Sequence, residues 1–381
     1  MRLASTRAGK TIRLPEGYEA FLPATLPPAP AIHSDPALLE LLSRASLELG
    51  RLDGAAQNLP NAELFVWMHV RREALLSSQI EGTQASLAEV LELEAKILDP
   101  SKPTDADEVV NYLDALLHGL DRLADGPIST ALIRELHVRL LAGTRGANKE
   151  PGRFRSNQNW IGVAGSTLQT ATFVPPPPGE IEPAIEALLS FLSEDNTLPT
   201  LMQIGLAHAQ FETIHPFRDG NGRIGRLLIT LLLCRQGLLK RPILYLSYYL
   251  RLNRAEYYDR LQSVRERGDW EGWLRFFLVG VTSVAADATR LSQDIVALRE
   301  RHRELIITGN ARPSRHLQLL DRLYDHPVVT IRFVEEMLSI TFPTASGLVQ
   351  SLVRVGILGE ISGRERDRIF GYREYLALLE T

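Results

Sequence analysis

The sequence predicts a mainly α-helical protein with only short pieces of strand. From Asp35 onward, leucines recur at three- and four-residue steps, the spacing that places apolar side chains along one face of a helix. The apolar segments 201–214 and 224–236 predict two further helices in the middle of the chain. Four short β-like runs complete the pattern, at residues 160–163, 172–174, 357–361 and 369–372.

The composition is that of a globular protein and excludes several functional classes. The chain has 381 residues, enough for two or three domains, and its 45% hydrophobic and 23% charged content excludes wholesale disorder. A net charge of −4 excludes a protein that binds polyanions over its whole surface, so any contact with nucleic acid would be local. The single cysteine, Cys234, excludes an internal disulfide and a zinc site built from cysteines.

Targeting signals and membrane-spanning segments are not expected. No apolar run approaches the roughly 18 residues that cross a bilayer. The basic N-terminus lacks the apolar segment of a secretory signal. We therefore expect a cytoplasmic protein with no membrane partner.

The N-terminal helical region is expected to span residues 1–125. Its first 35 residues are expected to be irregular, because they contain five prolines that forbid a long helix. A helix is expected from Asp35, and Asp105 is expected to cap another one. Two helices between these points are expected over 61–79 and from Ser86 onward.

The central region, residues 126–280, is expected to form the core. Ser129 is expected to cap a helix over 133–141. The segment 152–178 is rich in Gly, Asn, Gln and Pro, which predicts a long exposed loop containing a hairpin, and loops of this length are usually functional. The helices expected after it cover residues 181–192, 201–214 and 224–236.

The C-terminal region is expected to consist of a connecting helix over 281–311 and a winged helix over 312–381. Three helical segments, a strand, a basic turn and a second strand follow one another in the latter, the order typical of a winged helix. The turn contains Arg364, Arg366 and Arg368, yet the segment as a whole has nine basic and nine acidic residues. This balance favours a docking or dimerisation module over DNA binding, and it leaves a homodimer open.

The residues with the clearest chemistry lie together at 215–226, His-Pro-Phe-Arg-Asp-Gly-Asn-Gly-Arg-Ile-Gly-Arg. The Asp-Gly-Asn-Gly part is a turn whose glycines permit positive φ, and it opens onto a helix. The free N–H groups at the start of a helix, together with the helix dipole, form a site for anions such as phosphates. Arg223 and Arg226 lie one turn apart on that helix and add two permanent charges.

Two side chains beside this anion site supply further chemistry. Asp219 offers a hard oxygen ligand of the kind that Mg²⁺ takes together with substrate phosphates. His215 has the one side chain suited to accept a proton near neutral pH. Together these groups describe phosphoryl or nucleotidyl transfer from a magnesium nucleotide to a protonated nucleophile. Taken alone, Asp-Gly-Asn-Gly also fits an ordinary tight turn between two helices.

The segment 215–226 resembles the motif of the Fic (Fido) family, His-x-Phe-x-Asp/Glu-Gly-Asn-Gly-Arg-x-x-Arg, with every specified position filled. The resemblance implies a mainly α fold with a Fic-type helical core. It also implies a protein adenylyltransferase, which transfers AMP from ATP to a Ser, Thr or Tyr hydroxyl of a protein and releases pyrophosphate. The implied partners are ATP and a protein target with an accessible hydroxyl, the chain itself included.

The resemblance also assigns a role to each motif residue. It implies that His215 is the general base and that Asp219 holds Mg²⁺. The turn would cradle the α- and β-phosphates, Arg223 would assist it, and Arg226 would meet the γ-phosphate. The nucleotide-binding residues that it implies are Gly220, Asn221, Gly222, Arg223, Arg226 and, further along the chain, Asn253.

A second segment, Ser77-Ser78-Gln79-Ile80-Glu81-Gly82, resembles the inhibitory signature of the same family, Ser/Thr-x-x-x-Glu-Gly/Asn. A spacing of four places Ser77 and Glu81 on one helix face, and Gly82 is a natural helix stop. The resemblance implies that Glu81 pairs with Arg226 and so keeps it from the γ-phosphate. Such a pair contributes about 1.5–3 kcal/mol, enough to suppress turnover roughly ten- to hundredfold.

Other interpretations stay open beside this one. The loop 152–178 resembles the family's flap, whose edge could pair with an extended target segment. His208, Glu212 and His215 are spaced like metal ligands, but the His-Glu-x-x-His order of a zinc site is absent. Two alternative functions are a winged-helix transcriptional regulator whose Fic core senses a nucleotide, and removal of AMP from a target with Glu81 positioning the water.

Overall fold

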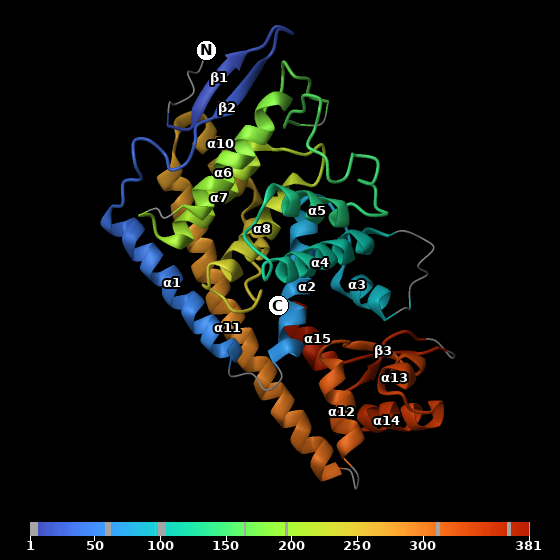
Figure 1. The fold of residues 1–381 in the computed structure, drawn as a ribbon. Helices are drawn as coiled ribbons and strands as arrows, with labels where there is room; N and C mark the ends of the chain where they lie inside the picture. Colours follow the sequence, from blue (N-terminus) through green and yellow to red (C-terminus); the bar gives the residue numbers. More distant parts are fainter. Residues whose placement is uncertain are drawn as a thin grey trace.

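The protein is described here by a computed structural model. The described residues are 7–57, 62–95, 97, 104–163, 165–194, 197–309, 313–363 and 367–380. Over these residues the chain is mainly helical, with one small sheet near each end of the chain (Figure 1). No helix among them combines the length and the apolar character that crossing a bilayer requires.

The N-terminal segment forms a β-hairpin, so the expectation of an irregular start is wrong. Strands β1 (Gly9–Arg13) and β2 (Glu19–Pro23) pair antiparallel. The hairpin also has a distant partner, because the Phe21 N–H donates to the Val174 carbonyl at 2.9 Å and the Phe21 ring lies 5.8 Å from that of Phe173. A two-stranded hairpin is marginal alone, so this contact with the 152–178 loop explains why local sequence did not reveal it.

Two long helices run side by side along one edge of the molecule (Figure 1). Helix α1 (Pro36–Gln57) begins where predicted, with the Asp35 carboxylate accepting the Leu38 N–H at 2.9 Å. Helix α11 (Trp270–Gly309) is continuous over 40 residues and therefore runs through the boundary expected after residue 280. Buried residues of both helices belong to one hydrophobic core shared with the central region.

Three helices follow α1 in the N-terminal region. They are α2 (Ala62–Ile80), α3 (Leu87–Glu94) and α4 (Asp105–Arg122). Ser86 caps α3 as predicted, through a capping box with Glu89. The cap of α4 is Thr104 rather than Asp105, because the Asp105 carboxylate instead accepts the Gln84 N–H at 2.6 Å.

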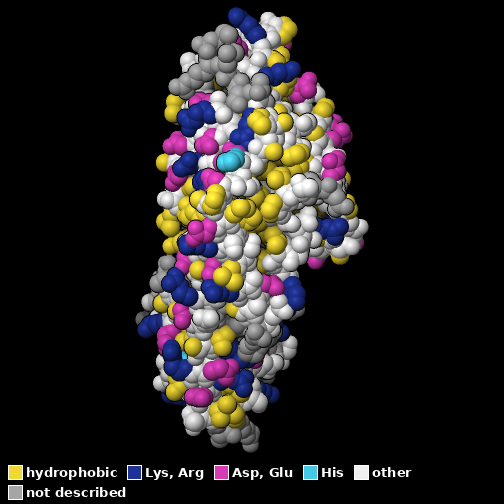
Figure 2. Space-filling view, turned by 90° about the vertical axis from the view of Figure 1, so that its left-hand side faces the viewer, with side chains coloured by type: hydrophobic (Ala, Val, Ile, Leu, Met, Phe, Trp, Pro, Cys, Tyr) yellow, Lys and Arg dark blue, Asp and Glu magenta, His cyan; other side chains and the backbone are white. Residues whose placement is uncertain are grey.

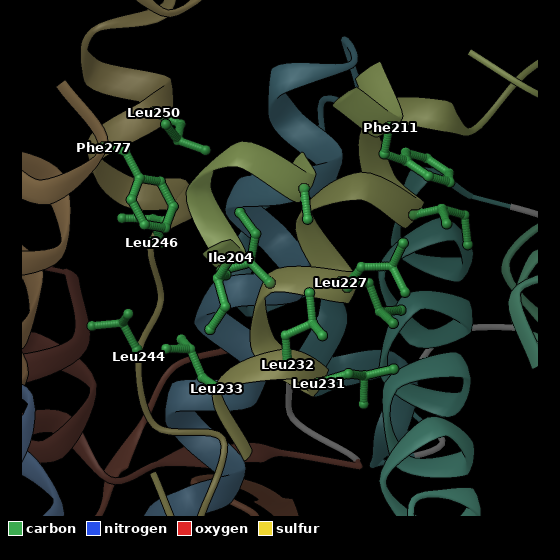
Figure 3. Packing of buried hydrophobic residues seen from close by; sticks show 14 of the residues in the cluster. Ile204, Phe211, Leu227, Leu231, Leu232, Leu233, Leu244, Leu246, Leu250 and Phe277 are labelled. Carbon is green, nitrogen blue, oxygen red and sulfur yellow. The ribbon is translucent and has the colours of Figure 1, made fainter. Parts of the chain in front are cut away.

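The central region is a helical bundle built around one buried helix. That helix, α8 (Asn221–Arg235), is buried at every position from 221 to 233. In Figure 3, its leucines lie among apolar side chains of neighbouring segments, such as Ile204, Phe211, Leu246 and Phe277. The other members are α5 (Thr130–Leu140), the short 3-10 turn η1 (Pro178–Glu180), α6 (Ile181–Ser193), α7 (Thr200–Ile214), α9 (Ser247–Leu252) and α10 (Arg254–Arg267). Burial of residues 221–233 fixes the position of α8 and therefore of the loop that precedes it.

The C-terminal block contains more elements than the sequence predicted. Its helices are α12 (Ser314–Leu323), α13 (Ile331–Leu338), α14 (Phe342–Arg354) and α15 (Arg373–Glu380). Its strands β3 (Val328–Thr330), β4 (Gly359–Glu360) and β5 (Ile369–Gly371) form one antiparallel sheet in the order β3-β5-β4. The short β3 and the final α15 were not predicted.

The winged-helix assignment of this block stays a prediction. Arg364 and Arg366 of the expected wing lie outside the described residues. The third wing arginine, Arg368, lies over the Phe370 ring at 5.6 Å.

The C-terminal block packs against the helices on both sides of the turn that follows Ile80. Met68 of α2 belongs to the hydrophobic core of the block. Leu91 of α3 forms a small buried cluster with Val328 and Ile369. The block is therefore joined to the N-terminal region as well as to α11.

The surface over α1 shows mixed charge. Figure 2 shows this side of the molecule, on which basic and acidic side chains are interspersed with apolar ones. This pattern agrees with the small net charge of the chain and gives this face no field of a single sign.

Candidate active site

The loop between α7 and α8 is shaped by two residues with left-handed backbone. His215, with φ of 50°, ends α7, and Gly220, with φ of 77°, precedes α8. The sequence suggested that Asn221 and Gly222 belong to the turn. In the structure they are instead the first residues of the helix. The first hydrogen bond of α8 runs from the Ile224 N–H to the Gly220 carbonyl, so the three preceding N–H groups are left for an anion.

The loop is anchored from inside. Phe217 is completely buried and its ring stacks on His137 at 3.7 Å. The Asn221 side chain accepts the Phe217 N–H and donates to the Phe217 carbonyl, both at 2.8 Å. The Asn221 amide, which was expected to cradle phosphates, is thus committed to the loop, and its backbone N–H is what remains for a ligand.

His215 is held in a setting that keeps its side chain neutral. Burial, helped by the charges of Arg265 and Arg155, lowers the pKa of His215 to about 3. The His215 carbonyl accepts a hydrogen bond from Arg155 Nε at 3.0 Å, and Arg155 also donates to the Pro176 carbonyl. A buried arginine at the start of the 152–178 loop therefore fixes the backbone of the histidine, a role that no local sequence signal revealed.

Asp219 lies at the edge of the loop with its side chain 41% exposed. Its Oδ1 accepts the Gly220 N–H at 2.6 Å and lies 3.7 Å from Arg223 Nη2. The described residues contain no cluster of three or more His, Cys, Asp or Glu side chains that could hold a metal. One partly exposed carboxylate beside an anion site nevertheless fits Mg²⁺, which takes most of its ligands from phosphates and water.

The spacing that resembled a metal site has another explanation. The two ring nitrogens of His208 lie 3.0 Å from the Gly225 carbonyl and 2.9 Å from the Tyr257 hydroxyl. Glu212 is buried beside them, and burial raises the pKa of its carboxyl to about 7. His208 therefore serves the packing of α7, α8 and α10.

Arg226 is buried and paired with the segment that resembles the inhibitory signature. Its Nη2 donates to Glu81 Oε1 at 2.7 Å and to the Ser77 carbonyl at 2.9 Å, and its Nε donates to Ser77 Oγ at 2.9 Å. Burial by itself would raise the pKa of Glu81, but the guanidinium of Arg226 overrides it and the pKa is lowered. The pair expected between Glu81 and Arg226 is therefore present.

The Glu81 carboxylate also occupies the start of α8. A Cβ atom on Gly222 would lie 2.1 Å from Glu81 Oε1 and 2.9 Å from Arg226 Nη1. Only glycine leaves room for the carboxylate there. A carboxylate thus lies where the N–H groups and the dipole of α8 favour an anion.

Arg223 has a partner that the sequence did not suggest. Its Nη1 donates to Glu108 Oε2 at 3.3 Å, and both side chains are buried. Glu108 also accepts from the Thr83 hydroxyl at 2.7 Å and pairs with Arg145 at 2.6 Å. A glutamate in an amphipathic helix has no local signal that distinguishes it from a solvated one.

Asn253 lies between α9 and α10, where its amide donates to the Tyr249 carbonyl at 3.0 Å. Its contact with a nucleotide stays a prediction. Nearby, Tyr257 is completely buried, whereas Tyr258 is 41% exposed. Burial and the charge of Glu81 raise the pKa of Tyr258, whose ring lies against that of Tyr257 at 5.1 Å.

The loop 152–178 is tied together at one point rather than as a regular hairpin. Ile161 and Phe173 exchange two backbone hydrogen bonds of 2.8 and 3.0 Å, and no longer strand pairing is present in the described part of the loop. Phe173 lies under the Arg265 guanidinium at 4.0 Å, and Arg265 also donates to the Glu212 carbonyl at 3.0 Å. Arg265 therefore links the loop to the end of α7, three residues before His215.

Comparisons with known proteins agree with this geometry. Residues 39–121 match the Fic/DOC family N-terminal domain and residues 127–233 match the Fic/DOC family domain. A probable protein adenylyltransferase of Aquifex aeolicus is 30% identical over 213 residues, 54% of this chain and 58% of that protein. A protein adenylyltransferase of Caenorhabditis elegans is 30% identical over 204 residues, 52% of this chain and 37% of that protein. The chain thus spans less than two thirds of the length of either relative.

A crystal structure of a Fic family protein from Desulfovibrio desulfuricans has the same fold. It superposes with a TM-score of 0.57 over 90% of this chain and 97% of that chain, at 20% identity. The prediction of a mainly α fold with a Fic-type core is confirmed by this likeness. With both of its family domains matched and this fold, the chain belongs to the Fic/DOC family.

Proposed function

We propose that this protein transfers AMP from ATP to a hydroxyl side chain of a protein, releases pyrophosphate, and is held in check by Glu81. The observation that carries the proposal is the position of a neutral His215 next to the start of α8, whose arginines and N–H groups suit a polyphosphate. Two relatives that are 30% identical to this chain are named protein adenylyltransferases, which supports the same reaction. A reaction that uses ATP also fits the cytoplasmic location expected from the sequence.

The proposed reaction is a displacement at the α-phosphorus of ATP. His215 accepts the proton of the target hydroxyl as its oxygen forms a bond to the α-phosphorus. The bond from that phosphorus to the β-phosphate oxygen breaks, and pyrophosphate leaves. Arg223 and the first N–H groups of α8 hold the phosphates and stabilise the negative charge that builds up on them.

Mg²⁺ would be held by Asp219 together with the phosphates. Bound there, the ion supplies charge neutralisation and orientation of the polyphosphate. Asp219 has its Oδ1 held by the Gly220 N–H, so the carboxylate is oriented before the nucleotide arrives. Asn221 stabilises the same loop from inside, which keeps His215 and Asp219 in register.

We propose that Glu81 inhibits by occupying Arg226 and the space beside Gly222. With this carboxylate in place, the γ-phosphate would meet a negative charge at the position it needs. ATP would then be displaced from the orientation that brings its α-phosphorus to His215. The expected suppression is roughly ten- to hundredfold, the value of one charge-assisted pair.

The test is transfer of label from ATP carrying ³²P at the α-phosphate, in the presence of Mg²⁺. Glu81→Gly is expected to raise self-labelling roughly ten- to hundredfold, and His215→Ala in that background to lower it by about 10²- to 10⁴-fold. Mass spectrometry would identify the product as an adenylate on a hydroxyl side chain. Asp125→Gly, which removes an exposed carboxylate that pairs with Arg122 in a turn, serves as the matched control.

The proposal fails on either of two results. One is a folded Glu81→Gly variant that incorporates no more label than the wild type. The other is labelling that persists at full rate without the imidazole of His215.

A further inference from the structure

Arg223, like Arg226, is a buried charge at the start of α8, and its surroundings are acidic on two sides. Its Nη1 lies 3.3 Å from Glu108 Oε2, and its Nη2 lies 3.7 Å from Asp219 Oδ1. Its buried Nε has no hydrogen-bond partner among the described residues. The guanidinium thus lies between two carboxylates and keeps one donor unused.

The two carboxylates differ in how firmly they are held. Glu108 lies in the first turn of α4, is 3% exposed, and accepts further bonds from Thr83 and Arg145. The N-terminal turn of a helix stabilises a negative charge, so Glu108 is a fixed anion. The Asp219 side chain is 41% exposed, and within the described part of the chain its carboxylate accepts a hydrogen bond only from the neighbouring Gly220 N–H.

We propose that Glu108 is a positioning residue for the nucleotide site. It holds the Arg223 guanidinium at one end, directs its remaining donors to the phosphates, and keeps it from closing onto Asp219. This inference rests on the proposed function, because it assumes that a polyphosphate lies at the start of α8. It concerns a residue of α4, 115 positions away in the sequence from the arginine that it orients.

Loss of Glu108 would leave Asp219 as the nearest carboxylate to a buried cation. Since Asp219 Oδ1 already lies 3.7 Å from Arg223 Nη2, a hydrogen-bonded pair between them needs only a small side-chain movement. That pair would withdraw both groups from ATP at once. Removal of Glu108 is therefore expected to weaken nucleotide binding more than it slows the chemical step.

Glu108 also connects this arginine to the turn that follows Glu81. The Thr83 hydroxyl, which donates to Glu108 at 2.7 Å, comes two residues after Glu81. The effect of Glu108 on the nucleotide must therefore be measured where inhibition is already absent. For this reason the test uses the Glu81→Gly protein as its parent.

The experiment measures the affinity for ATP by calorimetry in the presence of Mg²⁺. Glu108→Gln in the Glu81→Gly parent is expected to raise the Kd about tenfold, the loss of one charge-assisted contact. At saturating ATP, kcat for labelling is expected to stay within about threefold of the parent. Asp114→Asn, which removes a carboxylate of the same helix that pairs with exposed Arg139, is expected to leave Kd unchanged.

A cycle with Arg223→Gln shows whether Glu108 acts through the arginine. In the Arg223→Gln background, Glu108→Gln is expected to change Kd less than twofold, because its effect has already been lost. An unchanged Kd in Glu108→Gln, or a full tenfold change without Arg223, overturns the inference. If thermal melting shows Glu108→Gln unfolded, Glu108→Asp replaces it with the same expected direction, since it withdraws the carboxylate by one methylene.

Failure of the proposed function would be seen separately. If the Glu81→Gly parent binds ATP but transfers no label, the proposed reaction is wrong. The dependence of Kd on Glu108 and Arg223 still decides the inference about positioning. If the parent binds no ATP at all, both proposals are wrong.

Discussion

Two arginines at the start of α8, one turn apart, each meet a carboxylate from a different segment, and the two pairs differ in burial. Glu81, in the turn directly after α2, is 32% exposed where it meets Arg226. Glu108, in α4, is 3% exposed where it meets Arg223. The comparison teaches that one pair reaches solvent through its carboxylate, whereas both side chains of the other pair are buried.

The difference follows from how each carboxylate is attached. Glu81 lies in a turn directly before Gly82, whose φ is 99°, and its only hydrogen bond to a side chain is the one to Arg226 among the described residues. Glu108 lies in a packed helix and receives bonds from Thr83, Arg145 and Arg223. Exposed ion pairs contribute little to stability, whereas breaking a buried pair leaves an uncompensated charge.

The largest expected effect is on the free energy of unfolding. Glu108→Ala is expected to lower it by about 3–5 kcal/mol, because two arginines lose their buried partner. Glu81→Ala is expected to lower it by about 1 kcal/mol, because water enters its place and Arg226 keeps its bonds to Ser77. Urea unfolding of both variants measures the difference, and equal losses would contradict the distinction between the two pairs.

A third carboxylate near Arg226 gives the next largest effect. Burial raises the pKa of Glu212 to about 7, the charge of Arg226 opposes this shift, and the charge of Glu81 adds to it. The folded protein therefore holds a proton between pH 4.5 and about 7 that the unfolded chain releases, and stability falls as the pH rises through that window. The side chain of Glu212→Gln has no proton to lose, so this variant does not share the loss of stability. Its unfolding free energy relative to that of the wild type should therefore rise by about 1–3 kcal/mol as the pH goes from 4.5 to 8.

The measurement is the difference in unfolding free energy between Glu212→Gln and the wild type at each pH. This difference cancels the opposite trend of His215 and His208, whose pKa values are lowered to about 3 by burial and whose contribution is lost below pH 6.5. In the Glu81→Gly background the window should move to lower pH, because the repulsion from Glu81 is gone. A difference that does not change with pH would show that Glu212 does not titrate in this range.

The smallest expected effect is that of salt on the proposed inhibition by Glu81. Raising the ionic strength from about 0.05 to about 0.5 M should weaken the partly exposed Glu81–Arg226 pair more than the buried Glu108–Arg223 pair. At saturating ATP, wild-type labelling is expected to rise about twofold relative to Glu81→Gly, which shares every other effect of salt on the nucleotide. A ratio that stays constant would place the inhibitory pair out of reach of solvent.

Much of the helical framework could be predicted because the local spacing of apolar residues indicates where helices form. Apolar periodicity located α1, α7 and α8 within a few residues, and Ser86 and Ser129 cap the helices that they were expected to cap. The N-terminal hairpin was missed because its stability comes from a contact with residues 173–174. The strand β3 was missed because it is short and depends on its pairing with β5, which lies near the end of the chain.

The sequence alone determined which side chains are available at 215–226, and the prediction of an anion site, a base and a metal ligand rests on their types and order. Only the tertiary structure decided which partners these residues meet: Glu108 reaches Arg223 from α4, and the side chain of Asn221 turns back onto Phe217. The pair between Glu81 and Arg226 joins positions 145 residues apart, and family resemblance, rather than spacing, pointed to it. The physical reason is that local periodicity sets which face of a helix is buried, whereas the partner of a buried charge depends on how distant helices pack.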